Sequence, residues 1–274
     1  MPELPEVETL RRDLAPLLVG RRVTSVTATG LRSVRRTTPS AFETAVTGRS
    51  VTGIDRHGKY LLVRLADPVG TLIVHLRMSG QVLVASLKGE PPVHTHVHLG
   101  FGPDLRLWFV DPRTFGELWV SDGPQRLPPE MIHLGPDALI DGLIPANGWP
   151  TNRRVAVKAL LLDQTFVAGI GNIYADEICH RAGIRVDRSA GEVSRPAQRR
   201  LAAACAEVLE EAVAARGSTL GDGQYVDAFG RTGEFAMSHR VHAREGQPCV
   251  VCGRPIQRLI VAGRSAYQCR RCQR

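Results

Sequence analysis

The residues that follow the initiator methionine have the chemistry of a nucleophile and an acid. Pro2 and Glu3 come directly after Met1, and removal of methionine before a small residue would leave the proline nitrogen as a free secondary amine. An α-amino group loses its proton close to neutral pH, so an appreciable fraction is nucleophilic. Condensation of this amine with a sugar aldehyde carbon would give an electron-withdrawing iminium ion. The terminus therefore predicts covalent catalysis by Pro2 on a sugar.

Acidic side chains suited to proton transfer lie next to this amine. Glu3 is adjacent, and Glu6 follows one helical turn later. An alternative interpretation is that Pro5 and Glu6 merely begin a helix, since proline at the first position and acids in the first turn are common start signals. A helix over residues 5–19 is predicted in either case, because leucines recur at helical spacing before a glycine stop (Leu10, Leu14, Leu17, Leu18, Gly20).

Four cysteines at the other end of the chain have the spacing of a zinc site. Cys249 and Cys252 form one C-x-x-C pair and Cys269 and Cys272 another, which predicts a tetrahedral four-thiolate zinc. Two disulfides are the alternative, and they fit poorly with a chain that lacks a secretory signal. Residues 257–268 between the pairs predict a β-hairpin with Arg264 at its tip. So small a module needs the metal to fold.

Charge and composition narrow the class of protein. With 274 residues, one to three domains are expected. No run reaches the 18 apolar residues of a membrane span, and no signal segment is evident, so we expect a soluble cytoplasmic protein that does not associate with membranes. The net charge is +8, and residues 235–274 hold eight arginines against the single acid Glu245. A basic tail of this kind predicts a polyanionic partner.

Residues 22–120 predict a β-rich domain, a sandwich or a barrel, because short β-branched and aromatic runs alternate with turn residues. The predicted strands are 22–29, 51–55, 59–65, 71–76, 81–85, 96–101, 106–110 and 117–120. Within this region Gly58 permits a tight bend that would present Lys59. Met78 precedes a glycine turn, and Phe115 lies on a loop. Such side chains are either core residues or wedges that enter a base stack.

Residues 121–150 are rich in proline and glycine and predict a linker. Helices are predicted beyond it over 154–163, 173–182 and from Ser194 to Gly217. The turn at Gly169, Gly171 and Asn172 predicts either a phosphate cradle with Asn172 as helix cap or a sharp turn between packed helices. Residues 217–240 are glycine-rich and polar, which is typical of a mobile functional loop.

Together these motifs resemble the formamidopyrimidine-DNA glycosylase (Fpg/Nei) family of bacterial repair enzymes. The matching stretches span nearly the whole chain in family order: Pro2–Glu8, His57–Lys59, His75–Gly80, Asp111–Gly116, Gly169–Glu177 and the cysteine module. The resemblance implies an α+β multidomain protein. Its parts would be an N-terminal β-sandwich (1–133), a linker (134–150), a helix-two-turns-helix domain with a lesion loop (151–240) and a zinc finger (241–274).

The resemblance also implies roles for individual residues. Pro2 would form the Schiff base, Glu3 would assist sugar ring opening, and Lys59 and Arg264 would contact phosphate and assist β- and δ-elimination respectively; Glu6 is a further candidate acid. Contacts to damaged double-stranded DNA would come from His75, His94, Arg113, Arg153, Lys158 and Asn172. Met78, Arg113 and Phe115 would fill the space left by the extruded nucleotide. One structural zinc and a monomer on DNA, associated with the bacterial nucleoid, are expected.

Some positions depart from the family pattern. Thr114 stands where a second arginine is common, His242-Ala243 replaces a usual Tyr-Gly pair, and Arg216 replaces a common glycine. Two other functions stay open. One is excision of oxidised pyrimidines, as in endonuclease VIII, against which the Arg113–Phe115 loop argues. The other is a non-catalytic zinc-ribbon DNA-binding protein, which the basic tail alone would support.

Overall fold

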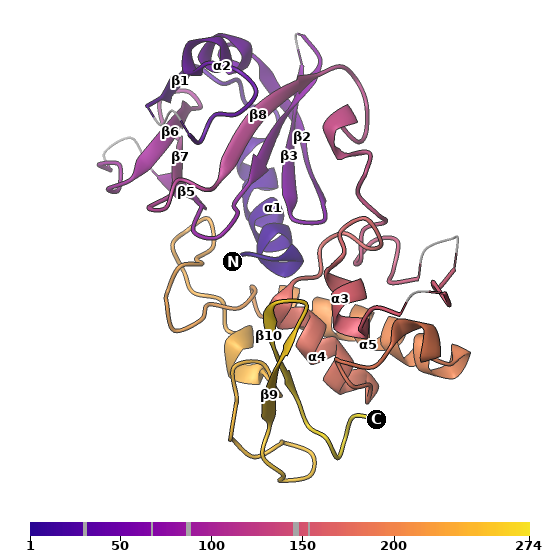
Figure 1. Cartoon of the computed structure of the whole chain (residues 1–274). Helices are drawn as coiled ribbons and strands as arrows, with labels where there is room; N and C mark the ends of the chain where they lie inside the picture. The colour runs from indigo at the N-terminus through magenta and orange to yellow at the C-terminus, as the bar shows by residue number, and fades with distance from the viewer. Residues whose placement is uncertain (30–31, 67, 86–88, 145–147, 153) are drawn as a thin grey trace. The chain divides into compact units, whose positions relative to one another are not determined.

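The computed structural model describes residues 1–274 except 30–31, 67, 86–88, 145–147 and 153 (Figure 1). The described residues divide into two units. The N-terminal unit comprises Met1–Ile132 together with Ala215–Glu234, and the C-terminal unit comprises His133–Ala214 together with Phe235–Arg274. Among the described residues, none of the helices combines the length and apolar character that a membrane span requires.

The N-terminal unit is a β-sandwich with helix α1 (Leu4–Leu18) packed into its core. One antiparallel sheet has the order β1-β6-β7-β5 and the other β2-β3-β4-β8. The bounds are β1 Ser25–Ala28, β2 Ser50–His57, β3 Tyr60–Ala66, β4 Gly70–His75, β5 Gln81–Ala85, β6 Thr95–Gly100, β7 Arg106–Val110 and β8 Glu117–Asp122. The apolar face of α1, with Leu10, Leu14 and Leu18, shares one core with side chains from both sheets. The predicted periodicity of this helix therefore fixes its buried face.

All eight predicted strands are present, and β5 and β7 have the predicted bounds. Helix α2 (Pro39–Val46) was not predicted. Its start signals are in the sequence, because the Thr38 hydroxyl accepts from Ala41 N at 3.2 Å and Pro39 occupies the first turn. The helix is short, and only Phe42 and Val46 are buried along it. Two apolar residues are too few for a helical period to be recognised.

Within its described residues, the C-terminal unit combines three α-helices with a zinc-finger hairpin. The helices are α3 (Val157–Leu162), α4 (Asn172–Ala182) and α5 (Arg195–Ala214), and the hairpin is β9 (Gln257–Val261) and β10 (Arg264–Gln268). Residues on both sides of the undescribed positions 145–147 pack within this unit. Gly135 N donates to Gln164 O at 2.8 Å, and the buried Trp149 indole donates to Ala190 O at 2.8 Å. The stretch predicted as a linker thus contributes packing to the unit that follows it.

The segment Ala215–Glu234 groups with the N-terminal unit, although the predicted domain 151–240 included it. The segment is held there by a hydrogen bond and an ion pair to residues of α1 that are far away in the sequence. Ser218 N donates to the Glu6 carboxylate at 2.7 Å, and Arg216 pairs with Asp13, both on α1. No periodicity within residues 215–234 carries this information, because the partners lie about two hundred positions earlier.

Candidate functional site

The N-terminus of α1 presents the predicted nucleophile and acid. Glu3 is the N-cap residue, and its backbone N–H donates to Glu6 Oε2 at 2.7 Å. Pro5 and Glu6 do begin the helix, so the start signals were interpreted correctly. Pro2 and Glu3 are buried directly ahead of the first turn. The positive end of the helix dipole favours a carboxylate at this position. Helix initiation and the predicted chemistry therefore involve the same residues.

The Glu6 carboxylate joins this terminus to a distant segment. Its second oxygen, Oε1, accepts from Ser218 N at 2.7 Å. Gly217 has φ +82°, and a Cβ there would lie 2.7 Å from the same oxygen, so a side chain at this position would be strained and would displace the Glu6 carboxylate. Each carboxylate oxygen thus accepts from a backbone N–H, an arrangement that fixes the positions of Glu3 and Ser218. Proton transfer by Glu6 stays a prediction.

The Lys59 turn is connected to α1 through a buried ion pair. Gly58 has φ +56°, and with Lys59 it forms the two-residue connection from β2 to β3. The Arg56 guanidinium, whose side chain is 1% exposed, donates to Gly58 O at 2.9 Å and to Glu8 Oε2 at 3.2 Å. Glu8 belongs to α1, the helix that Pro2 and Glu3 directly precede. The predicted nucleophile and Lys59 are therefore held on one rigid frame.

Glu8 is ionised in this network. Burial by itself raises the pKa of Glu8, but hydrogen bonds from Arg11 and Arg12 and the charge of Arg56 outweigh burial and lower it to about 2. Arg12 Nε donates to Glu8 Oε1 at 2.8 Å. A carboxylate that meets three guanidinium groups is stabilised in its charged form.

Replacing Glu8 by glutamine is expected to lower the free energy of unfolding at pH 7 by about 3 kcal/mol, because the native pKa lies well below its usual value of 4.5. Between pH 4.5 and about 2 the unfolded carboxyl binds the proton and the folded one does not. Wild-type stability therefore falls as the pH is lowered through this window. Urea titrations at several pH values would reveal the difference shrinking toward pH 2. Asp104→Asn, in an exposed pair with Arg21, is the matched control and is expected to leave stability unchanged.

Asp111 connects two turns that carry candidate DNA-intercalating residues. Its fully buried carboxylate accepts from Ser79 Oγ at 2.5 Å, from Arg113 N at 3.1 Å and from Gly116 N at 2.6 Å. Ser79 follows Met78, and Gly116 follows Phe115. One carboxylate therefore orders the 76–80 turn and the 111–116 loop together.

Two apolar side chains on these turns are exposed to solvent. Met78 is 40% and Phe115 47% exposed. The Arg113 guanidinium lies 5.0 Å from the centre of the Phe115 ring, within the range of a cation–π contact. These exposures favour the wedge interpretation over the core interpretation for both residues.

The two predicted histidine contacts differ in their surroundings. His94 is exposed on a turn with φ +67°. His75 ends β4 and is buried, and burial, followed by the nearby charges of Arg77 and Lys59, lowers its pKa to about 3. Its Nδ1 accepts from Arg77 N at 3.1 Å. His75 is therefore neutral at physiological pH, and its Nε2–H is the ring donor for any ligand.

In the C-terminal unit, the turn before α4 is ordered by one glutamine. Gln164 donates to Leu162 O and Ile170 O and accepts from Gly169 N, at 2.9–3.0 Å. The N-cap of α4 is Gly171, so Asn172 is the first helical residue and not the cap. Arg153, the other predicted contact before this turn, lies outside the described residues.

Lys158 supports the hairpin that carries Arg264. Its side chain is fully buried, and its ammonium donates to Asp176 Oδ1 and to Ser265 O, each at 2.7 Å. The other Asp176 oxygen is 2.9 Å from His242 Nδ1. Arg264 itself is exposed at the start of β10, after the two-residue turn of Ala262 and Gly263. In this structure Lys158 thus links α3, α4 and β10 from inside the unit.

The four cysteines fit a single tetrahedral metal ion. Their sulfur atoms all lie within 4.8 Å of one another, with 3.4 Å between Cys252 and Cys269 and 3.8 Å between Cys249 and Cys272. Zinc–thiolate bonds of about 2.3 Å in a tetrahedron place sulfurs about 3.8 Å apart. The residues present therefore fit one structural zinc, as the spacing predicted.

Several residues that organise these sites were missed by sequence analysis. They are acids and an arginine buried by tertiary contacts: Glu8, Arg56, Asp111, Asp176 and Glu177. Glu177, for example, accepts from the backbone N–H groups of Arg240, Val241 and His242 at 2.8–3.0 Å. A charged residue on the apolar face of a predicted helix, as at Glu177 on α4, was the available signal.

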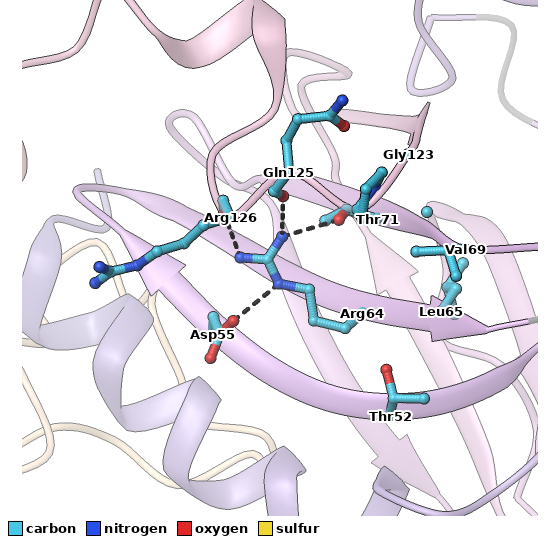
Figure 2. Close-up of a pocket in the computed structure, with 11 residues that line it drawn as sticks. Thr52, Asp55, Arg64, Leu65, Val69, Thr71, Gly123, Gln125 and Arg126 are labelled. Carbon is cyan, nitrogen blue, oxygen red and sulfur yellow. Dashed lines mark hydrogen bonds and ion pairs between the residues drawn. The ribbon is translucent and has the colours of Figure 1, made fainter.

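A pocket of about 370 Å³ lies over β2, β3, β4 and the turn after β8 (Figure 2). Arg64 lies at its centre and donates to Asp55 at 2.8 Å, to Thr71 at 3.0 Å and to Gln125 O at 3.1 Å. Its remaining nitrogen donates to Arg126 O. Since every guanidinium nitrogen is used internally, Arg64 attaches the 123–126 turn to the sheet, and we assign the pocket no ligand.

The sequence matches three family models in the order of the chain. They are described as formamidopyrimidine-DNA glycosylase N-terminal domain (residues 1–118), formamidopyrimidine-DNA glycosylase H2TH domain (134–223) and zinc finger found in FPG and IleRS (246–274). A protein of Alkalilimnicola ehrlichii named formamidopyrimidine-DNA glycosylase is 45% identical, with 100% of both chains covered.

Solved structures give the same result. The MutM (Fpg) protein of Thermus thermophilus superposes with a TM-score of 0.85 at 39% identity, covering 99% of this chain and 98% of that one. A MutM in complex with DNA containing carbocyclic 8-oxo-G superposes with a TM-score of 0.86 at 33% identity, covering 99% of both chains.

Proposed function

The chain belongs to the formamidopyrimidine-DNA glycosylase family, DNA glycosylases of base excision repair, and we propose that it excises oxidised purines from duplex DNA and then cleaves the strand. The substrates would be 8-oxoguanine and formamidopyrimidines. The observation that carries this proposal is the frame in the N-terminal unit: Pro2 and Glu3 precede α1, and Glu8 of that helix holds the Lys59 turn through Arg56.

In the proposed reaction the Pro2 nitrogen, freed by loss of Met1, forms a bond to the deoxyribose C1′ as the bond from C1′ to the base breaks. The departing base takes up a proton. Glu3 donates a proton to the ring oxygen, so the sugar opens and the iminium forms. Loss of a C2′ proton expels the 3′ phosphate, assisted by Lys59. Loss of the C4′ proton then expels the 5′ phosphate, assisted by Arg264.

The damaged nucleotide must leave the duplex for C1′ to be reached, and a few kcal/mol is the usual cost. The exposed Met78 and Phe115, with Arg113 against the Phe115 ring, are suited to fill the space it leaves. His75, His94, Asn172 and Arg153 would contact phosphates, which hold the register without reading sequence. For the buried Lys158 we propose an indirect role, through Ser265 O and the Arg264 hairpin. The active form would be a monomer on DNA.

Reduction with borohydride during the reaction is expected to trap a covalent adduct between the protein and a duplex containing 8-oxoguanine. The adduct should be absent from a variant in which retained Met1 blocks the proline nitrogen. A duplex with thymine glycol tests the alternative substrate class and is expected to be excised more slowly. If wild-type protein with a free Pro2 excised 8-oxoguanine without any trappable adduct, the Schiff-base mechanism would be wrong.

A further inference from the structure

The segment Ala215–Glu234 is anchored to the N-terminal unit on either side of an exposed turn. Residues 221–223 are exposed, and a Cβ added to Gly221 or Gly223 would meet no atom within 4 Å. The chain enters the segment from α5 and leaves it into the C-terminal unit, so both ends are tethered. The contacts that anchor the residues on either side of this turn therefore determine where the turn lies relative to α1.

Hydrogen bonds attach the residues on either side of this turn to α1 and to β5. On the α1 side, Ser218 N donates to the Glu6 carboxylate at 2.7 Å, and the buried Tyr225 hydroxyl is 3.4 Å from Glu6 O. On the β5 side, Gln81 Nε2 donates to Gln224 O and Val84 N donates to Ala228 O, each at 2.8 Å. The residues on either side of the exposed turn thus have fixed partners in the N-terminal unit.

Arg216 adds an ionic connection at the same place. Its guanidinium pairs with Asp13 of α1 and, through Nε at 2.8 Å, with Asp227 later in the segment. Asp227 is fully buried and also accepts from the backbone N–H groups of Phe229 and Arg231, each at 2.9 Å. Asp13 is 8% exposed. A guanidinium shared by two largely buried carboxylates is costly to break, because either acid would then be left buried and unpaired.

The backbone at Arg216 indicates that the side chain is used. Its φ is +61°, in the left-handed region, and Gly217 follows at φ +82°. Glycine adopts this conformation without the steric cost that an L-residue bears. An arginine here therefore carries a conformational cost, which its ion pairs with Asp13 and Asp227 offset.

We propose that Arg216 is a positioning residue that fixes the anchored part of the segment to α1 and so places the exposed turn 221–223 against the damaged nucleobase. This inference rests on the proposed function, since it requires a damaged nucleobase to be bound beside Pro2 and Glu3. Glu3 caps the helix that carries Glu6 and Asp13, so the reactive terminus and the turn share one support. Contact between the turn and the nucleobase can affect excision only while the nucleobase is attached to the sugar. An abasic site has no nucleobase, so its cleavage does not depend on this contact.

The test compares excision of 8-oxoguanine with cleavage of a preformed abasic site in the same duplex. Arg216→Gly keeps the left-handed backbone and removes the guanidinium, and Asp13→Asn removes its partner on α1. Each is expected to lower kcat/KM for 8-oxoguanine excision about tenfold and to leave abasic-site cleavage unchanged. The double variant should lose no more than either single one, because the two residues act through one contact.

Arg231→Ala is the matched control, since Arg231 pairs with Asp227 without reaching α1. It is expected to leave both activities unchanged. Amide exchange at Ser218 should quicken in Arg216→Gly and remain slow in Arg231→Ala. The inference is overturned if Arg216→Gly excises 8-oxoguanine at the wild-type rate, or if both activities fall equally. Were the wild-type protein to process neither duplex, the proposed function would fail first, and this inference with it.

Discussion

Cys249→Ser is expected to lose the bound zinc and unfold the hairpin that carries Arg264. The module has a very small apolar core: Val241, Ile256, Val261 and Ala266 are buried there with the ligands Cys249 and Cys269. Structural zinc contributes about 10–16 kcal/mol of apparent binding energy in isolated zinc-finger peptides. Without the metal, little else offsets the entropy of ordering residues 241–274.

Three measurements check this expectation. Metal analysis should fall from one zinc per chain to a small fraction, amide exchange over β9 and β10 should become fast, and affinity for damaged duplex should fall at least tenfold. Cys205→Ala is the control, because Cys205 is buried on α5 and is not part of the four-cysteine group. A Cys249→Ser protein that kept stoichiometric zinc would contradict the four-thiolate assignment.

Glu3→Gln is expected to reduce excision of 8-oxoguanine at least 100-fold while leaving the fold intact. Positioned acids and bases typically contribute about 10²–10⁴-fold to a rate, and glutamine cannot donate the proton that ring opening needs. The helix start should survive, since the Glu6 carboxylate accepts from the backbone N–H of residue 3, which glutamine retains. Single-turnover kinetics on a duplex with one 8-oxoguanine would measure the loss.

Glu210→Gln, on the exposed face of α5, is the matched control and should retain wild-type rates. Thermal unfolding of both variants should match that of the wild type within a few degrees. Unchanged excision by Glu3→Gln would remove Glu3 from the mechanism. Persistent DNA binding by a wild-type protein that excises neither 8-oxoguanine nor thymine glycol would favour the non-catalytic alternative.

Local patterns were sufficient wherever the determinant of structure lies within a few residues. The alternation of apolar residues and the turn glycines predicted all eight strands of the sandwich. The hairpin was predicted with residues 262–264 as its turn; the structure confirms the hairpin, with Ala262 and Gly263 at φ +49° and +72° forming the turn and Arg264 as the first residue of β10. The spacing of the cysteines predicted their meeting, because two C-x-x-C turns joined by a hairpin bring four thiols together.

Long-range electrostatics could not be predicted in the same way. Glu8 and Arg56 look like ordinary surface charges in the sequence, yet their side chains are 7% and 1% exposed. Lys158 was predicted as a phosphate contact because of its position in a motif, whereas its ammonium is engaged with Asp176 and Ser265 O. Whether a charged side chain is buried depends on whether the fold places a partner of opposite charge beside it. When the two partners are far apart in the chain, no local sequence pattern indicates the pair.

The sequence by itself determined the eight strands, the helices α1, α3, α4 and α5 and the zinc module, since these depend on periodicity, turn chemistry and motif spacing. Only the tertiary structure decided which unit residues 215–234 join and how Pro2, Glu3 and Lys59 share a frame. Those outcomes depend on the contacts Glu6–Ser218, Arg216–Asp13 and Glu8–Arg56. Each contact joins residues that are far apart in the sequence, so it forms only when folding brings them together away from water. In the unfolded chain the same groups are exposed and interact weakly.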